Sequence, residues 1–255
     1  MIRAAALVSG DGALLQTVLD SMYFGEIPNF ELTAVICTES DAYALRRARN
    51  SGVEAFVVEP SLFPTKLSYS MAVSNKLRDM DIDLVILAGY NMPLGVISTQ
   101  FRKRIIGVYP SLIPAFVNCD DAPERAALER GCRVTGATAF FADIDGNIGA
   151  IIAQQAVDIL PNDTPESLSR RIMEDAEWKL LPKAIILYCQ NRIEINGHLA
   201  DALGNDIRRG KTKGGIDALA HVDGDRLIVG IGNGDLLHMG IEGRDDSLGE
   251  RHNLG

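Results

Sequence analysis

The sequence predicts an α/β protein with an open, mostly parallel sheet, followed by a small β module. Short apolar runs alternate with helical patterns as far as Tyr109, and this repeat builds parallel sheets with right-handed crossovers. The runs are continuous rather than alternating, as expected of strands that helices cover on both faces. The predicted strands are Ala4–Val8, Leu32–Thr38, Ala55–Val58, Leu84–Ala88 and Ile105–Tyr109. The predicted helices between them are Leu14–Tyr23, Ala42–Ser51, Lys66–Met80 and Leu94–Arg102.

The pattern changes after Gly131. Two strand-like runs, Val134–Ala142 and Ala150–Val157, are joined by a polar turn at 143–147. Runs joined by so short a turn pair with each other as a hairpin. We therefore expect an antiparallel pair beside the parallel strands.

A long helix is predicted after this pair. Thr164 has the side chain of an N-cap, and Pro165 fits the first helical position, where no N–H is needed. The helix is expected to end near Ala176 or, after an adjustment near Pro182, to continue to Gln190.

The composition shifts near the C-terminus, which suggests four segments. These are a main domain at 1–197, a linker at 198–212, a β module at 213–243 and a tail at 244–255. Turn signals separate three strand-like runs in the module, namely Ala218–Val222, Arg226–Ile231 and Leu236–Ile241. Three short strands alone are only marginally stable, so we expect the module to pack on the main domain or on a second copy of the chain.

The composition argues against several kinds of binding partner. The 255 residues carry a formal net charge of −9, which argues against nucleic acid or an anionic membrane as a partner. The apolar N-terminal run stops at Ser9, too early for a signal peptide or a membrane span, so we expect a cytoplasmic protein. No CxxC pair occurs, so we expect reduced thiols and no metal site, the cysteines being Cys37, Cys119, Cys132 and Cys189.

One segment points to a known family. Residues 107–114, Gly-Val-Tyr-Pro-Ser-Leu-Ile-Pro, resemble the signature Asn-x-His-Pro-Ser-Leu-[Leu/Ile]-Pro of the folate-dependent formyltransferases, in particular the glycinamide ribonucleotide transformylases. Weaker matches run in the same order along residues 1–197, at 8–16, 41–49, 84–90, 126–131, 135–138 and 174–182. The resemblance implies a Rossmann-like formyltransferase fold. It also implies a site for 10-formyltetrahydrofolate and a ribonucleotide phosphate.

The same resemblance locates three catalytic positions. The family's Asn, His and Asp fall on Gly107, Tyr109 and Asn147, and no histidine occurs before His198. Glycine offers no side-chain donor, a phenol with an ordinary pKa of about 10 is a poor proton shuttle, and an amide is no base. We therefore expect no catalytic residue of the family reaction to be retained. Tyr109 as a catalytic acid, and Asp143 or Asp145 as substitutes, remain alternatives to roles at a strand end and in a β-turn.

The resemblance also assigns two binding regions. The substrate region comprises Gly10, Asp11, Gly12, Ala13 and Glu177. The folate region comprises Tyr90, Asn91, Met92, Leu94, Asp143 and Asp145. Ala13 and Leu14 remove the hydroxyl and amide donors of the family's phosphate loop, and the charge of Asp11 would repel a phosphate.

Three functions remain open on the sequence alone. The first is a formyltransferase-fold protein that no longer transfers formyl groups and acts as a small-molecule-binding or regulatory protein. The second is a divergent folate-dependent formyltransferase or hydrolase of purine and one-carbon metabolism, with 10-formyltetrahydrofolate as its cofactor. The third is an oligomeric scaffold, for which a homodimer is the simplest form.

Overall fold

The computed structural model describes residues 1–117, 119 and 121–196, together with the backbone of the strands at 199–202, 207–211, 217–223, 226–230 and 236–240. The chain divides into two compact units, Met1–Asp201 and Ala202–Gly255. Among the described residues, no helix is long and apolar enough to span a bilayer.

The first unit is built on a nine-stranded sheet in the order β3-β2-β1-β4-β5-β6-β7-β9-β8. Strands β1 to β5 run parallel to one another, whereas β6 is antiparallel to both β5 and β7. The predicted mostly parallel sheet with one antiparallel pair is therefore confirmed. The strands are β1 Ile2–Val8, β2 Phe30–Cys37, β3 Glu54–Val57, β4 Leu84–Leu87, β5 Ile105–Tyr109, β6 Val134–Ala142, β7 Ile148–Asp158, β8 Ile193–Asn196 and β9 Leu199–Ala202.

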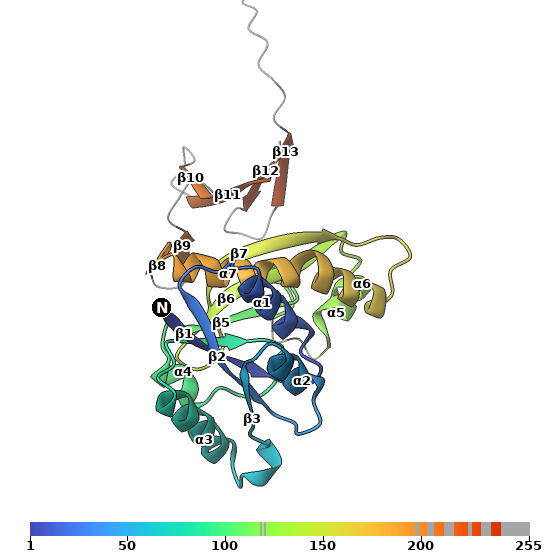
Figure 1. Ribbon diagram of the computed structural model, residues 1–255. Coiled ribbons are helices and arrows are strands. Elements are labelled where there is room, and N and C mark those ends of the chain that lie inside the picture. Colours follow the sequence, from blue (N-terminus) through green and yellow to red (C-terminus); the bar gives the residue numbers. More distant parts are fainter. Residues whose placement is uncertain are drawn as a thin grey trace, which may run out of the picture. The chain divides into compact units, whose positions relative to one another are not determined.

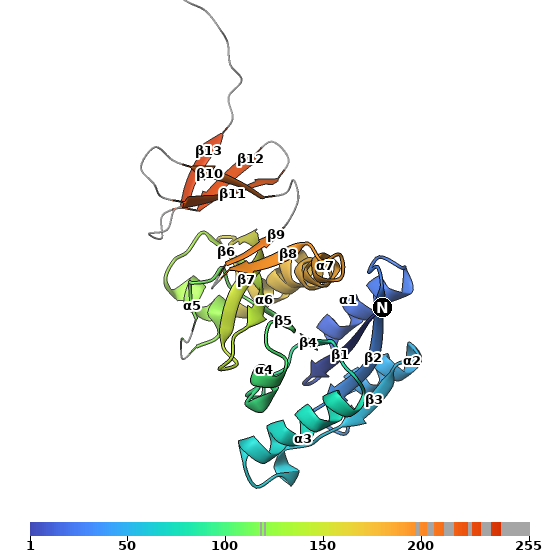
Figure 2. The same ribbon diagram turned by 90° about the vertical axis from the view of Figure 1, so that its left-hand side faces the viewer.

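Helices cover both faces of this sheet. Figures 1 and 2 show α3 and α4 on one face and α1 and α7 on the other. This arrangement explains why the apolar runs of the strands are continuous, since both faces are buried. The helices are α1 Ala13–Tyr23, α2 Tyr43–Asn50, α3 Lys66–Asp79, α4 Val96–Gln100, α5 Pro123–Glu129, α6 Pro165–Ile172 and α7 Trp178–Cys189.

One core cluster lies between the sheet and the pair α3 and α4. In this cluster, α3 contributes side chains at every third or fourth position, which is the spacing of one helical face. They pack against residues of β1, β2, β4, β5 and β6. Its fully buried members include Leu7, Tyr69, Val73, Leu77, Val85, Ile97 and Ile105.

Helix α4 is shorter than the predicted Leu94–Arg102. Gly95 has a φ of 51°, so the helix starts only after it. Leu94 is buried with 4% of its surface exposed. The apolar residue at the start of the predicted helix is thus a core residue of the preceding loop.

The long C-terminal helix of the first unit begins as predicted. The Thr164 hydroxyl accepts a hydrogen bond from the Ser167 N–H, and Pro165 occupies the first turn. The predicted adjustment near Pro182 is misplaced. It is a π-turn at Met173–Glu177, which absorbs one extra residue, and Pro182 lies inside α7.

The second unit is a four-stranded antiparallel sheet in the order β10-β11-β12-β13. Its strands are β10 Ile207–Lys211, β11 Asp217–Asp223, β12 Arg226–Gly230 and β13 Leu236–Gly240. The last three correspond to the predicted runs, and the range predicted as a linker holds β9 and β10. The predicted tail at 244–255 lies outside the described residues, and the docking of the module stays a prediction.

Asp163 joins the end of β7 to the start of α6. Its carboxylate accepts two hydrogen bonds from the Arg171 guanidinium, at 2.6 and 2.5 Å, and one each from Ser167 Oγ and the Leu160 N–H. Arg171 also donates to the carbonyl of Asp158, the last residue of β7 (2.9 Å). The hydrogen bonds from Arg171 hold the pKa of the Asp163 carboxyl well below its usual range.

We expect Asp163→Asn to lower the free energy of unfolding at neutral pH by about 2 kcal/mol, because a charge-assisted pair is lost. A carboxyl with a depressed pKa stabilises the fold above its unfolded pKa of about 4, and this stabilisation is lost as the pH falls further. Urea unfolding of both proteins at pH 7 and pH 3 tests this. The difference should shrink at pH 3, and Asp175→Asn, at an exposed acid bound only to Lys179, is the control. An undiminished difference at pH 3 would contradict the assignment.

Candidate functional site

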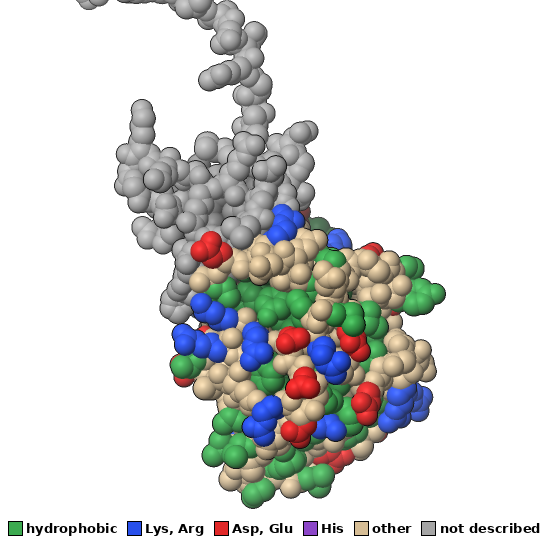
Figure 3. All heavy atoms as spheres, turned by 60° about the vertical axis from the view of Figure 1, so that its left-hand side comes forward, with side chains coloured by type: hydrophobic (Ala, Val, Ile, Leu, Met, Phe, Trp, Pro, Cys, Tyr) green, Lys and Arg blue, Asp and Glu red, His purple; other side chains and the backbone are tan. Residues whose placement is uncertain are grey.

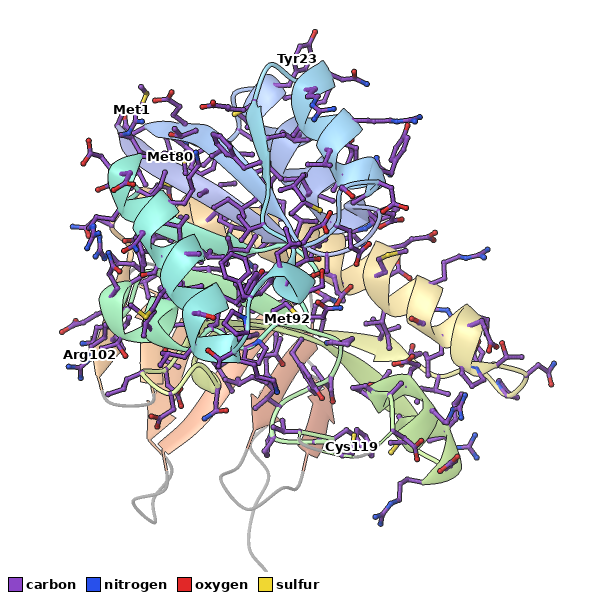
Figure 4. All side chains as sticks on the ribbon, turned by 90° about the horizontal axis from the view of Figure 1, so that it is seen from below. Met1, Tyr23, Met80, Met92, Arg102 and Cys119 are labelled. Carbon is purple, nitrogen blue, oxygen red and sulfur yellow. The ribbon has the colours of Figure 1, made fainter. Side chains whose placement is uncertain are left out.

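The candidate site lies at the carboxyl edge of the parallel strands. Strand β1 pairs with β2 on one side and with β4 on the other, so the chain order reverses between β1 and β4. Open α/β sheets bind their ligands in the crevice outside such a reversal. Figure 4 shows Met1, Met80 and Arg102, which precede β1, β4 and β5, along one side of the molecule. Met92 and Cys119, which follow β4 and β5, lie away from that side.

A polar network crosses the reversal. Ser9 Oγ donates to Asn91 Oδ1 (2.7 Å) and accepts from the Asn91 N–H (3.3 Å) and from Thr38 Oγ1 (3.1 Å). The three residues follow β1, β2 and β4, which are neighbours in the sheet. Thr38 is buried, whereas Asn91 is exposed. This switch-point network, Ser9, Thr38 and Asn91, fixes the three loops relative to one another.

The first loop is closed by its own side chains. Asp11 Oδ1 accepts a hydrogen bond from the Ala13 N–H (3.0 Å), which is one of the free donors at the start of α1. Arg47 Nε donates to the Asp11 carbonyl (3.0 Å). Gly12 has a φ of 72°, and a Cβ there would lie 2.8 Å from the Cβ of Ala44, so only glycine fits. The loop therefore presents the carboxylate of Asp11 where the resemblance implies donors to a phosphate.

Gly107 lies in β5, where a side chain would crowd its neighbours. A Cβ there would be 3.0 Å from Phe140 Cζ and 3.2 Å from Leu87 Cδ1, closer than ordinary carbon–carbon contact. Leu87 and Phe140 are its neighbours in β4 and β6. The space next to position 107 is therefore filled by apolar groups.

Tyr109, at the end of β5, is bonded to the loop that follows it. Its hydroxyl donates to the Phe116 carbonyl (2.9 Å), and the Cys119 thiol donates to the same oxygen (3.1 Å). Burial raises the pKa of the Tyr109 phenol, and the charges of Cys119 and Glu124 act in the same direction. At neutral pH Tyr109 is therefore a neutral hydrogen-bond donor that holds this loop.

Two further bonds brace the loop against β6. Thr138 Oγ1 donates to the Ser111 carbonyl (2.6 Å) and accepts from the Ile113 N–H (3.1 Å). Gln154 Nε2, from β7, donates to the Ile113 carbonyl (3.0 Å). The loop at 110–117 is thus held by β5, β6 and β7 together.

Three of the six residues assigned to the folate region, Tyr90, Met92 and Leu94, lie in or against the core. The hydroxyls of Tyr90 and Tyr69 are 3.1 Å apart, and burial raises the pKa of the Tyr90 phenol. Met92 and Tyr90 pack against the cluster under α3, and Leu94 is part of it. Asn91 is the polar residue of this segment that faces solvent.

Asp143 shapes the turn between β6 and β7. Its Oδ1 accepts from the N–H groups of Asp145 (2.9 Å) and Asn147 (2.8 Å), which is an Asx-turn arrangement. Ser98 Oγ in α4 donates to the Ile144 carbonyl (2.7 Å) and fastens the turn to the helix. Asp145 and Asn147 are exposed. The geometry gives Asp143 a structural role, as the turn chemistry of the sequence favours.

Glu177 is the strongly perturbed acid of the site. It closes the π-turn, and its pKa is raised to about 7, first by burial and then by the negative charge of Glu124. Glu124 lies in the first turn of α5 and also acts on Tyr109. Sequence reasoning missed Glu124 and Cys119 as neighbours of Tyr109, because no motif marks them and only the fold brings them close.

Two hollows lie away from this edge. One, of about 260 Å³, is lined by Arg78, Asp83, Gln100 and Arg104 at the opposite ends of the strands. The other, of about 410 Å³, runs along β7 and is lined by Asp158, Arg171, Asp175 and Lys179 among others. Figure 3 shows acidic and basic side chains interspersed on one face of the first unit. Within the described part of the chain, no three His, Cys, Asp or Glu side chains are grouped to hold a metal ion.

Comparison with known proteins gives consistent matches. The model of the formyl transferase family matches residues 2–185. Phosphoribosylglycinamide formyltransferase of Haemophilus influenzae is 32% identical over 201 residues, covering 78% of this chain and 93% of that protein. The human trifunctional purine biosynthetic protein adenosine-3 is 32% identical over 196 residues, which span only 19% of its length.

Solved structures agree. Glycinamide ribonucleotide transformylase 1 from Symbiobacterium toebii superimposes with a TM-score of 0.76 at 39% identity, covering 80% of this chain and 95% of that one. Phosphoribosylglycinamide formyltransferase from Anaplasma phagocytophilum gives a TM-score of 0.72 at 29% identity. The family match, the identities and the shared fold together show that this chain belongs to the formyl transferase family and resembles its glycinamide ribonucleotide formyltransferases.

Proposed function

We propose that this protein is a small-molecule-binding or regulatory protein of the formyltransferase fold that does not transfer formyl groups to glycinamide ribonucleotide. The observation that carries the proposal is the filled space at Gly107, where the resemblance implies a catalytic asparagine. With Phe140 Cζ 3.0 Å and Leu87 Cδ1 3.2 Å from the position of a Cβ, both side chains would have to shift by a few tenths of an ångström to admit that amide. Loss of one such oxyanion donor costs about a hundredfold or more in rate.

The other two positions support the same proposal. The Tyr109 hydroxyl is already bound to the Phe116 carbonyl, and its pKa is raised rather than lowered toward neutrality. Asn147 has no ionisable side chain, and its exposed turn is organised by Asp143. The Asp11 carboxylate at the first loop weakens any attraction for a phosphate dianion. A binding or regulatory role within purine or one-carbon metabolism is the function that fits these groups.

One observation favours a second candidate, a divergent formyltransferase or hydrolase that uses 10-formyltetrahydrofolate. Glu177 has a pKa raised to about 7, which suits a group that accepts or donates a proton at neutral pH. Its position in a π-turn adds support, because such turns are frequent at functional sites. We rank this candidate second because the oxyanion donor and the phosphate donors are both missing.

We expect the purified protein to give no measurable formyl transfer from 10-formyltetrahydrofolate to glycinamide ribonucleotide. The triple variant Gly107→Asn/Tyr109→His/Asn147→Asp should gain little activity, because the side chains of Phe140 and Leu87 crowd the new amide and displace it. Adding Phe140→Ala opens that space, and we expect the quadruple variant to exceed the triple variant by about a hundredfold. A spectrophotometric assay of folate product measures all three proteins.

Two outcomes would contradict this proposal. A catalysed rate from the unchanged chain that Tyr109→Phe abolishes would make Tyr109 a catalytic acid. An active triple variant with Phe140 intact would show that the packing at position 107 does not exclude an asparagine.

A separate prediction concerns Glu177. A carboxyl whose pKa rises on folding binds a proton that the unfolded chain has lost, so stability falls as the pH rises from about 4 to 7. Glu177→Gln mimics the protonated form, and we expect it to unfold with about 2 kcal/mol more free energy than the parent at pH 8, and equally at pH 4. Denaturant unfolding at both values tests this. Glu174→Gln, at an exposed acid of the same turn, should change neither. Equal stability of the parent and Glu177→Gln at pH 8 would show that folding does not raise the pKa of Glu177.

A further inference from the structure

We propose that the hollow of about 260 Å³ at the amino ends of β4 and β5 binds a small aliphatic α-amino acid in its zwitterionic form. Two cationic side chains hold the carboxylate of the ligand and two acidic ones hold its ammonium group, namely Arg78 and Arg104, and Asp81 and Asp83. This amino-edge hollow lies at the opposite ends of the strands from the candidate site. The inference therefore goes beyond the proposed function, which does not involve these residues.

The charged side chains that line the amino-edge hollow do not pair with one another. Among the described residues, no carboxylate oxygen lies within 4.0 Å of a side-chain nitrogen of Arg78 or Arg104. Arg78 Nη2 donates instead to Asn75 Oδ1 (2.9 Å). Arg104 Nη2 donates to the Gln100 carbonyl (3.1 Å). A guanidinium has five N–H donors, so most donors of both arginines are left for a ligand.

The two acids are held in place by backbone hydrogen bonds. The Asp83 N–H donates to the Arg3 carbonyl (2.8 Å), and Asp83 Oδ2 accepts from the Arg3 N–H (3.0 Å). Asp81 follows helix α3 with a φ of 52°, and its N–H donates to the Arg78 carbonyl (2.9 Å). No described group donates to the Asp81 carboxylate or to Oδ1 of Asp83, so both acids keep acceptor oxygens for a ligand.

Arg104 lies over an apolar floor. Its guanidinium carbon is 5.1 Å from the centre of the Phe101 ring, and its N–H donates to the Phe101 carbonyl (2.8 Å). Phe101 and Ile82, which line the hollow, are only 2% and 5% exposed. A ligand therefore meets apolar groups next to the charges, which fits an aliphatic side chain. Because the backbone of the lining residues is already fixed, binding orders few further groups.

The mixed charge of the lining selects the class of ligand. Burial raises the pKa of the Tyr188 phenol in α7, the charge of Arg104 lowers it and the charge of Asp83 raises it, so a cation and an anion lie close to one point of the fold. A plain anion such as phosphate is attracted by the arginines but repelled by the aspartates, whereas a zwitterion is attracted by both. The carboxylate of an amino acid also matches the bidentate geometry that guanidinium groups favour.

Three ligands of nearly the same shape test the inference. L-Leucine carries both charges, 4-methylpentanoate lacks the ammonium group, and 3-methylbutylamine lacks the carboxylate. Their affinities for the full chain are measured at pH 7 by titration followed in ¹H–¹⁵N NMR spectra, which also show whether each variant is folded. The main variants are Arg104→Gln and Asp83→Asn, whose new amide oxygen can still accept from the Arg3 N–H. Arg102→Gln and Asp79→Asn make the same changes of charge at exposed neighbours that do not line the hollow.

We expect the parent protein and both control variants to bind leucine about tenfold or more tightly than either analogue, with the largest shifts at residues 78–83 and 100–104. Arg104→Gln should bring the affinities for leucine and the amine to within about twofold of each other, because the carboxylate has lost its main partner. Asp83→Asn should do the same for leucine and the acid, because the ammonium group has lost one of its partners.

Three outcomes would overturn the inference. If 4-methylpentanoate binds the parent as tightly as leucine, the hollow is a plain anion site. If leucine does not bind at concentrations up to about 10 mM, the hollow is not a ligand site of useful affinity. If either main variant keeps the full preference for leucine, the charge that it removes plays no part in binding. None of these results bears on the proposed function, which the formyl-transfer assay tests separately.

Discussion

The packing of Leu87 and Phe140 over Gly107 is the contact on which both the architecture and the chemistry of this protein depend. It lies where the sheet changes from parallel to antiparallel, between β4, β5 and β6. The absence of a Cβ lets the Phe140 ring and the Leu87 side chain approach the Gly107 backbone closely, and both side chains lie in or against the core under α3 and α4. The same side chains crowd the place that a catalytic asparagine would take.

The loops at the carboxyl edge share one design, in which their polar groups bond to one another. The Tyr109 hydroxyl is bound to a backbone carbonyl, the Asp143 carboxylate to backbone N–H groups, and the Asp11 carboxylate to the start of α1. Groups used in this way stabilise loops and are withdrawn from proton transfer. Glu177 differs from these groups, because burial and the negative charge of Glu124 raise its pKa to about 7.

Much of the fold could be predicted because its signals are local. The apolar runs at 4–8 and 84–88 coincide with β1 and β4, and Thr164 with Pro165 marks the start of α6. The misplaced features depend on backbone geometry that composition does not reveal. The φ of 51° at Gly95 delays α4, and a π-turn one turn before Pro182 takes up the extra residue of the last helix. The motif identified the residues of the site but not the side chains that contact them. Glu124 and Cys119, which act on Tyr109, were therefore missed.

The family resemblance, the order of the elements and the residues at 107, 109 and 147 could be read from the sequence. Periodicity and motif spacing lie along the chain, so no tertiary information is needed for them. Three features become visible only in the fold: Phe140 crowds the side-chain position at Gly107, Ser9 is hydrogen-bonded to Asn91, and Glu124 raises the pKa of Glu177. The physical reason is that clearance, hydrogen-bond direction and electrostatic environment are set by atoms 30 or more residues apart in sequence, which the fold brings within a few ångströms.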